Sequence, residues 1–149
     1  MRILSPAFQN GQLIPGKYTQ DGENISPPLV IEAVPQGAQS LVIIMEAIDA
    51  DFNPIKTHWM IWNVSPNIGK IGENSIPMGA CAGINDFWQV GYVGPCPPPG
   101  VKEMFSFSCF ALDRALNVSL SITPFDLKKA VEQHLVTFDS LEGYYIRKL

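Results

Sequence analysis

The sequence predicts an all-β fold with a minor helical part, arranged as a sandwich or Greek key. Thirteen prolines and twelve glycines are spread through the 149 residues, and both residue types interrupt regular structure, so the elements should be short. Apolar or alternating runs of strand length lie between these interruptions, and a helical pattern occurs only late in the chain. This length suits one hydrophobic core, and we expect a single domain over residues 1–149.

Five segments are expected to form strands: 40–49, 58–64, 104–112, a weaker one from Pro28, and one over 143–149 that closes the chain. The first is an almost continuous apolar run, which is typical of a buried strand. The second is aromatic and β-branched, and the third alternates, with phenylalanines and Cys109 on one face and serines on the other. These patterns predict that the core is built from strands.

One helix is expected over residues 124–136. Thr123 is a favourable N-cap residue, Pro124 suits the first helical position, and Asp126 follows the cap by three residues. Three apolar residues then recur at helical spacing: Leu127, Val131 and Leu135. The pattern therefore predicts one amphipathic helix near the C-terminus.

Composition argues against several classes of partner. The net charge is −4 and no basic run occurs, which argues against binding to nucleic acid and against membrane anchoring through a polybasic patch. The longest apolar run, 41–48, is too short to span a bilayer, and the N-terminus lacks the apolar core of a signal peptide. We therefore expect a cytoplasmic protein. With only 16% charged residues, its surface is also compatible with a homodimer.

Cysteine and histidine usage bears on redox state and cofactors. Cys81, Cys96 and Cys109 fit free thiols in a reducing compartment better than a disulfide framework. A pair between Cys81 and Cys96 stays open as an alternative for an exported chain. His58 and His134 lie far apart and the sequence has no zinc-type spacing, so we expect no metal and no other cofactor.

Polar residues gather where the first long strand ends. Asp49 and Asp51 follow that strand, and they would point the same way if it continued. His58 opens the next strand, so a short hairpin would bring it beside them, where a carboxylate would favour the imidazolium form. Simple solvation of a strand end is the alternative, and the residues leave both interpretations open.

The segment 91–100, GYVGPCPPPG, contains four prolines and three glycines. Proline fixes φ and removes a backbone donor, so this loop should have a nearly constant shape. Such a loop suits the wall of a binding site, and a rigid turn between strands is the alternative. Within it, Cys96 could act as a nucleophile with His58 as its base, although a small residue packed in a tight loop is the simpler interpretation.

Four segments occur in the same order and with similar spacing as in the phosphatidylethanolamine-binding proteins: IPGKYTQDGENISPPL, DADFNP…THWMIWNV, NDFWQVGYVGPCPPPG…FSFSCFALD, and the terminal helix followed by LEGYYIRKL. The chain resembles the small bacterial and archaeal branch of this family, called Raf-kinase-inhibitor-like, over nearly its whole length. The resemblance implies a β-sandwich with a large antiparallel central sheet and a smaller second sheet. It also implies a small pocket that binds phosphate, phosphoryl head groups or acetate.

The same resemblance assigns residues to the pocket. Asp49 and Asp51 match the aspartates of the family's Asp-Pro-Asp-x-Pro pattern, and His58 matches its strand histidine. Four further residues fall on the family's glycine-proline loop: Tyr92, Gly94, Cys96 and Pro97.

The chain departs from the family pattern at the Gly-x-His-Arg-Tyr segment, where Lys102, Glu103 and Met104 replace the last three residues. Adjacent strand residues face opposite ways, so Lys102 and Glu103 should not both line the pocket. We expect Lys102 to supply a cation there in place of the histidine. Ala50 also replaces the first proline of the aspartate motif.

The leading interpretation is a small binding protein, not an enzyme, that recognises an anion or a partner surface presenting one. Family members in eukaryotes modulate kinases, and a regulated partner protein is expected here by analogy. Two alternatives remain: a hydrolase that uses Cys96 or Asp49 with His58, and a protein that inhibits proteases through surface loops. We expect anion binding in the millimolar range, about −4 kcal/mol, and a pocket that is inert or selects a different ligand is the alternative.

Overall fold

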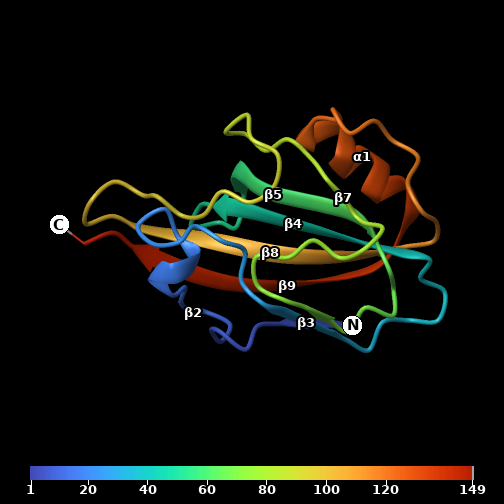
Figure 1. Ribbon diagram of the computed structural model, residues 1–149, viewed down its shortest axis with the longest axis horizontal. Helices are drawn as coiled ribbons and strands as arrows, with labels where there is room; N and C mark the ends of the chain where they lie inside the picture. The colour runs from blue at the N-terminus through green and yellow to red at the C-terminus, as the bar shows by residue number, and fades with distance from the viewer. Residues whose placement is uncertain (149) are drawn as a thin grey trace.

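The computed structural model describes residues 1–148 and consists of two stacked β-sheets (Figure 1). Across these residues the larger sheet has six strands in the order β2-β9-β8-β4-β5-β7, and the smaller has three in the order β1-β3-β6. The strand pairs are antiparallel, apart from β2 with β9. In chain order the elements are β1 (Arg2–Leu4), β2 (Gln12–Leu13), a short 3-10 helix (Gly16–Tyr18), β3 (Leu29–Glu32), β4 (Ser40–Ile48), β5 (Pro54–Val64), β6 (Lys70–Ile71), β7 (Cys81–Ala82), β8 (Lys102–Leu112), α1 (Pro124–His134) and β9 (Leu135–Ile146).

The expected β-sandwich with a large and a small sheet is confirmed, with changes at the ends of strands. The strand expected over 58–64 already begins at Pro54, and the one expected over 143–149 begins at Leu135 and runs to Ile146. The last residue of that expected strand, Leu149, lies outside the described residues. Both extensions follow from pairing with a long neighbouring strand, which local sequence patterns do not register.

Helix α1 begins where the sequence predicts and ends earlier. The hydroxyl of Thr123 accepts a hydrogen bond from the backbone N–H of Asp126 at 3.1 Å, which caps the first turn. The helix ends at His134, two residues before the expected end near residue 136, because Leu135 has extended backbone angles and starts β9. Leu135 therefore lies in a strand, although its spacing placed it on the apolar face of the helix.

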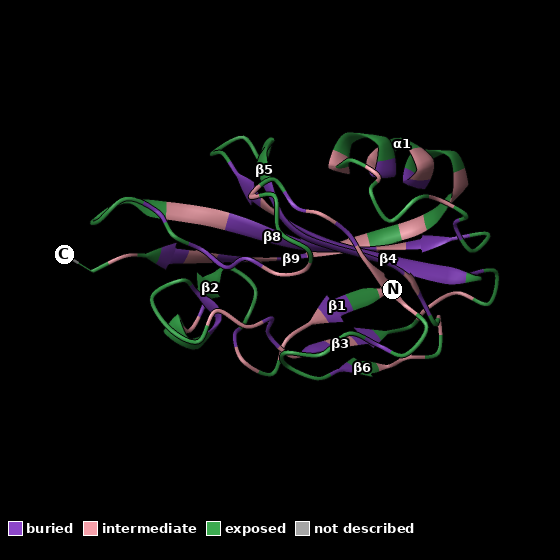
Figure 2. Cartoon of the chain, turned by 45° about the horizontal axis from the view of Figure 1, so that its top comes forward, coloured by how far each residue is buried: buried purple, intermediate pink, exposed green. Residues whose placement is uncertain are grey.

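Strand β4 lies inside the large sheet and is buried on both faces (Figure 2). On one face, Met45 and Phe107 pack in a core that includes Ile31 of the small sheet. On the other face, Ile44 belongs to a second core that includes Leu127 of α1. The large sheet is therefore the middle layer, with the small sheet and α1 on opposite sides of it.

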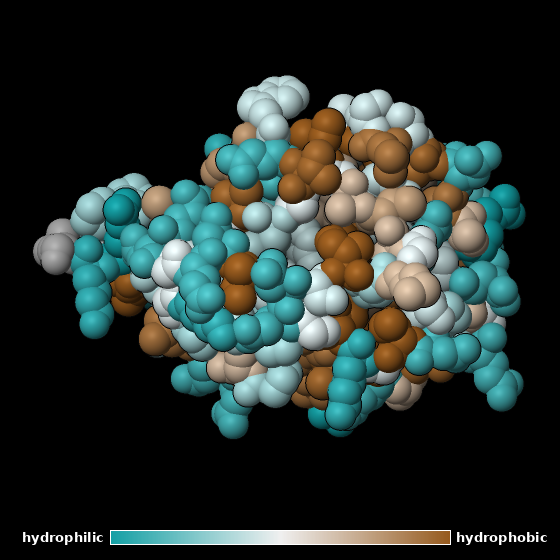
Figure 3. All heavy atoms as spheres, in the orientation of Figure 1, coloured by the Kyte–Doolittle hydropathy of each residue, from teal (hydrophilic) through white to brown (hydrophobic). Residues whose placement is uncertain are grey.

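The surface is mixed in polarity. Figure 3 shows apolar side chains lying between polar ones on the face seen in Figure 1, in keeping with the low content of charged residues. In the described part of the chain, no helix is both long and apolar enough to cross a membrane. Within residues 1–148 the three thiols are unpaired, so the alternative disulfide between Cys81 and Cys96 is not formed.

Candidate functional site

A β-bulge sets the direction of His58. One step along β4, from Met45 to Glu46, corresponds to two steps along β5, so His58 has no partner on β4. Regular alternation would place His58 and Trp59 on opposite faces of the sheet. The bulge instead turns the imidazole toward the small-sheet side, where it meets the ring of Phe105 edge-on at 5.2 Å between centroids.

His58 is buried and held in one orientation. Its Nδ1 lies 2.7 Å from the carbonyl oxygen of Val93, so Nδ1–H donates and Nε2 remains the unprotonated ring nitrogen. Burial lowers the pKa of His58 below its ordinary value; the carbonyl of Val93 opposes this shift and the charge of Lys56 adds to it. His58 is therefore neutral near pH 7, and not the imidazolium that neighbouring aspartates would favour.

His58 contributes to a cavity of ≈ 200 Å³ at one end of the large sheet. The lining comes from β4, β5, β8 and the long segment between β7 and β8: Ala47, Ile55, Lys56, His58, Phe87, Cys96 and Glu103. The ring of Phe87 meets His58 edge-on at 4.8 Å between centroids, so the histidine is enclosed by aromatic rings.

Two charged side chains line this cavity. The ammonium of Lys56 lies 4.3 Å from the centre of the Phe87 ring, a distance at which the ring attracts a cation. Glu103 is half-buried, and burial raises the pKa of its carboxyl group while the charge of Lys56 opposes that rise. The cavity thus presents one cation, one carboxylate and a neutral imidazole.

The loop 91–100 forms one wall and is fixed at several points. The backbone N–H of Val93 donates to the carbonyl of His58 at 3.0 Å, and the N–H of Gln20 donates to the carbonyl of Pro95 at 2.9 Å. Gly94 lies so close to the backbone of Tyr18 that a Cβ there would be 2.3 Å from its carbonyl oxygen. The loop is therefore anchored to both β5 and the N-terminal segment.

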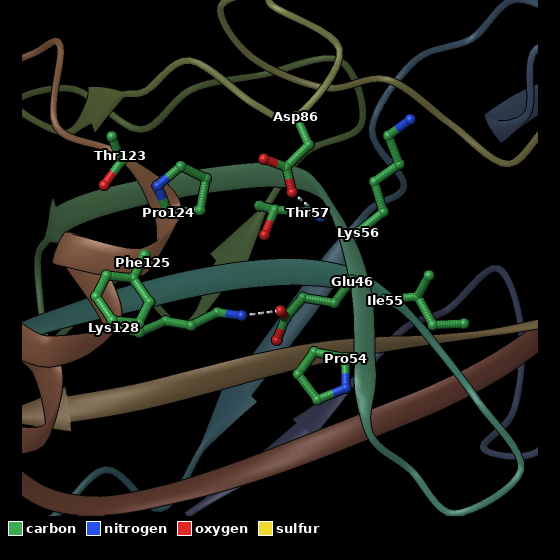
Figure 4. A pocket seen from close by; sticks show the side chains of 10 residues that line it. All are labelled: Glu46, Pro54, Ile55, Lys56, Thr57, Asp86, Thr123, Pro124, Phe125 and Lys128. Carbon is green, nitrogen blue, oxygen red and sulfur yellow. Dashed lines mark hydrogen bonds and ion pairs between the residues drawn. The ribbon is translucent and has the colours of Figure 1, made fainter.

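A neighbouring cavity of ≈ 290 Å³ lies between α1 and the beginning of β5 (Figure 4). There Lys128 forms an ion pair with Glu46, and the carboxylate of Asp86 accepts a hydrogen bond from the N–H of Thr57 at 2.7 Å. Figure 4 shows Lys56 extending away from the pair of Lys128 and Glu46. The ammonium of Lys56 is thus directed elsewhere, and this residue also lines the His58 cavity.

The structure brings together only part of the predicted site. Two predicted residues line the cavity, His58 and Cys96, and three lie in the adjoining loop: Tyr92, Gly94 and Pro97. Tyr92 is directed away, because its hydroxyl donates to the carbonyl of Tyr18 at 2.6 Å and its ring packs edge-on against Trp59.

The remaining predicted residues do not line the cavity. Asp49 caps the turn between β4 and β5, since its Oδ1 accepts hydrogen bonds from the N–H groups of Asp51 and Asn53, each at 2.9 Å. The ammonium of Lys102 lies 4.4 Å from the centre of the Tyr144 ring. The cation at the cavity is Lys56, so the geometry gives no support to Lys102 in that role.

Sequence reasoning missed five of the lining residues: Ala47, Ile55, Lys56, Phe87 and Glu103. Glu103 shares its face of β8 with Phe105, so the alternation along this strand could have identified it. Lys56 lies in the part of β5 that the sequence did not predict as strand. Phe87 comes from a long irregular segment, and no local pattern indicates that it would meet His58.

The family model described as phosphatidylethanolamine-binding protein matches residues 4–146. The chain belongs to the phosphatidylethanolamine-binding protein family. A UPF0098 protein of Pyrococcus abyssi is 41% identical over 152 residues, covering 97% of this chain and 85% of the relative. Another UPF0098 protein, from Methanothermobacter thermautotrophicus, is 40% identical over 152 residues and 99% of each chain.

Solved structures of the phosphatidylethanolamine-binding protein family have the same fold. A putative homologue from Chlamydia trachomatis, CT736, superposes with a TM-score of 0.89 at 33% identity, over 98% of this chain and 97% of the other. YbcL of E. coli superposes with a TM-score of 0.90 at 22% identity, over 99% of this chain and 98% of the other, and this likeness shows the fold alone.

This member of the phosphatidylethanolamine-binding protein family departs from the family's pattern inside its own cavity. Where the family's Gly-x-His-Arg-Tyr segment starts the strand, the side chain that faces the cavity is the carboxylic acid Glu103. Glu103 stands at the arginine of that pattern, so a group that can gain a negative charge takes the position of a permanent cation.

Proposed function

We propose that this chain is a binding protein that holds a small phosphoryl or carboxylate group in the cavity beside His58. One observation carries the proposal: the bulge in β5 turns His58 into a cavity that Lys56 also lines. The volume of ≈ 200 Å³ suits a small head group or a free anion and is below that of a typical drug-sized ligand site.

The lining offers complementary contacts to a phosphoryl group. The ammonium of Lys56 attracts the anionic oxygens. The unprotonated Nε2 of His58 accepts a hydrogen bond from a P–OH group, since Nδ1–H is already donated to Val93. Glu103 opposes a bare anion, but burial raises its pKa, so its repulsion weakens as the pH falls toward that pKa.

The same carboxylate favours a ligand that carries an amine beside its anion. In phosphoethanolamine an ammonium is linked to a phosphoryl group by a short chain, and these two ends match Glu103 and Lys56 in charge. Free phosphate and phosphoethanolamine should therefore respond in opposite ways to removal of the carboxylate.

The test is a titration with phosphate, phosphoethanolamine and phosphoserine, followed by two-dimensional amide NMR at pH 7. The native chain should bind with a Kd of about 1 mM, with shifts confined to residues near 54–58 and 93–103. Lys56→Gln should weaken binding of each ligand about tenfold, and the control Lys102→Gln should leave it unchanged. Phosphoserine stands for a partner protein that presents a phosphorylated side chain.

Glu103→Gln separates the ligand classes. It should strengthen phosphate binding about fivefold, since removing one nearby like charge corresponds to about 1 kcal/mol. Phosphoethanolamine should bind less tightly to the same variant, because its ammonium loses a partner. Absence of localised shifts at about 50 mM ligand, or equal effects of Lys56→Gln and Lys102→Gln, would contradict the proposal.

A hydrolase is the second candidate, because Cys96 and His58 line the same cavity. The Nε2 of His58 is unprotonated and could accept a proton, but the sulfur of Cys96 accepts its hydrogen bond from Arg147, at 3.7 Å. Among the hydrogen bonds of residues 1–148, none joins Cys96 to His58. Ester hydrolysis that is lost in Cys96→Ser would favour the hydrolase, and binding without turnover favours our proposal.

A further inference from the structure

A second cavity, of ≈ 340 Å³, lies on the small-sheet side of β5 and does not involve His58. Its lining comes from the segments 24–26, 74–76 and 90–92, together with Trp59 of β5 and Ala82 of β7. No residue of this lining also lines the His58 cavity, so the two cavities have different walls. The volume falls within the range of sites that hold small organic molecules.

None of the described residues that line this cavity carries a charge. The lining combines apolar side chains, such as Ile25 and Ile76, with the amides of two asparagines and the hydroxyls of two serines. An ion that entered would leave water without meeting an opposite charge, which is unfavourable. The cavity therefore suits an uncharged ligand, in contrast to the cavity beside His58, which Lys56 and Glu103 line.

The indole of Trp59 carries a polar group without a partner. Trp59 is 1% exposed, and its Nε1 is the one buried side-chain nitrogen or oxygen of residues 1–148 that forms no hydrogen bond. The ring of Tyr92 meets the indole edge-on at 5.6 Å between centroids, while the hydroxyl of Tyr92 donates to the carbonyl of Tyr18. A buried donor without a partner destabilises the fold, and an indole N–H can only donate. The group that would satisfy it is a hydrogen-bond acceptor.

Two more side chains of the lining have polar groups that can bond to a ligand. Ser26 is 5% exposed, and among the side-chain hydrogen bonds of residues 1–148 none involves its hydroxyl, although its carbonyl accepts from the N–H of Asn74 at 2.9 Å. The Oδ1 of Asn24 accepts from the N–H of Gly94 at 2.7 Å, so the NH₂ group is the part of this amide that remains to donate. Together with the indole of Trp59, the cavity offers mainly donors, and the ligand should therefore present acceptors.

We propose that this cavity is a second ligand site, which takes an uncharged molecule that joins a carbonyl group to a short apolar chain, such as an amide or an ester. The carbonyl oxygen accepts from the Nε1–H of Trp59, and Ser26 and Asn24 are further partners for the polar end of the ligand. Because the Nε1 atom is covered, a wall side chain must turn to admit the oxygen. Ile76 and Val90 line the cavity and are 45% and 70% exposed, so they are free enough to turn and then to cover the apolar chain.

The first test follows the indole N–H directly, by two-dimensional NMR during titration with pentanamide. This amide should bind with a Kd of about 10 mM and shift the Nε1–H cross-peak of Trp59, which is identified by its loss in Trp59→Phe. Pentanoate and pentylammonium, which carry a charge on a similar chain, should leave this cross-peak in place at about 50 mM. Shifts with pentanoate should instead lie near His58, so this site and the proposed anion site can fail separately.

The second test uses variants. Trp59→Phe keeps an aromatic ring and removes the donor, and it should weaken pentanamide binding about fivefold, the effect of one hydrogen bond. Ser26→Ala removes a single oxygen and should weaken binding about threefold, which keeps the test valid if Trp59→Phe loosens the core. The matched control is Trp88→Phe, at an indole that is 90% exposed and outside the lining, and it should bind as the native chain does.

Three results would overturn the proposal: a Trp59 cross-peak that does not move at about 50 mM pentanamide, equal binding of the amide and the two ions, or equal effects of Trp59→Phe and Trp88→Phe. A contact between the indole N–H and a long-lived water that persists at saturating pentanamide would do the same, because the acceptor would then be water alone.

Discussion

One inserted residue in β5 decides which face of the sheet carries His58. Without the bulge, the imidazole would point toward the α1 side together with Met60, whose side chain belongs to the second core. With the bulge, it lies against Phe105 and faces Lys56 and Glu103 in the cavity. The chemistry of the site therefore depends on a local irregularity of a single residue.

Glu103 should make the stability of the fold depend on pH. Its pKa is raised on folding because burial disfavours the carboxylate. The folded chain therefore binds a proton at Glu103 more readily than the unfolded chain does. Above the folded pKa, the negative charge of Glu103 lowers the free energy of unfolding. Below the unfolded pKa, the carboxyl group is protonated in both states and this destabilisation is absent. Glu103→Gln should therefore raise the thermal unfolding midpoint at pH 7 and have little effect near pH 3.

The control for this experiment is Glu132→Gln, at an exposed position on α1, which should change the midpoint little at either pH. Differential scanning calorimetry at both pH values measures the effect. A lower midpoint for Glu103→Gln at pH 7 would show that attraction to Lys56 outweighs the cost of burying the carboxylate.

The loop 91–100 is an element without regular structure that is still held in one shape. Four prolines limit its backbone, and hydrogen bonds tie Val93 to β5 and Pro95 to Gln20. Gly94 lets the loop lie directly against the N-terminal segment, because a Cβ at this position would be 2.3 Å from the carbonyl oxygen of Tyr18. The backbone N–H of Gly94 also donates a hydrogen bond to the side chain of Asn24 at 2.7 Å. The wall of the cavity is thus positioned by the N-terminal segment.

Gly94→Ala should destabilise the protein by about 1–3 kcal/mol, the usual cost of forcing an extra group into a packed site. The new Cβ would be 2.3 Å from the carbonyl oxygen of Tyr18 and 2.9 Å from the Cα of Thr19, and backbone atoms cannot move aside cheaply. Urea unfolding measures the change. Gly37→Ala is the matched control, since a Cβ there has no neighbour within 4 Å, and equal losses in the two variants would contradict this account.

At the scale of the whole molecule, the large sheet joins two hydrophobic cores. Successive residues of β4 face opposite sides, so the strand contributes Met45 to the core beneath the small sheet and Ile44 to the core beneath α1. Neither core can lose its packing without disturbing the strand that both share. The three layers should therefore unfold together.

Two substitutions on opposite sides of the sheet test this coupling. Ile31→Ala in the small sheet and Leu127→Ala in α1 remove side chains that are 4% and 0% exposed, and each should cost about 2–5 kcal/mol. Each variant should still unfold in one transition, with the same midpoint by far-UV and near-UV circular dichroism. Separate midpoints in either variant would mean that the corresponding layer unfolds independently.

Much of this architecture could be predicted because its signals are local. The apolar run in β4, the alternation in β8 and the cap at Thr123 each depend on residues that are near one another in the sequence. The early end of α1 was not predictable in this way. Leu135 keeps the helical spacing, but pairing with β8 draws it into β9.

The sequence by itself determined the β-rich class, the start of the helix and the stiff proline loop, because periodicity, capping and backbone restriction act within a few residues. Only the tertiary structure decided the companions of His58. Lys56, Phe87 and Glu103 meet it through a bulge, an irregular segment and a distant strand. Such contacts depend on the register between segments far apart in the chain, and one inserted residue changes that register without leaving a local signal.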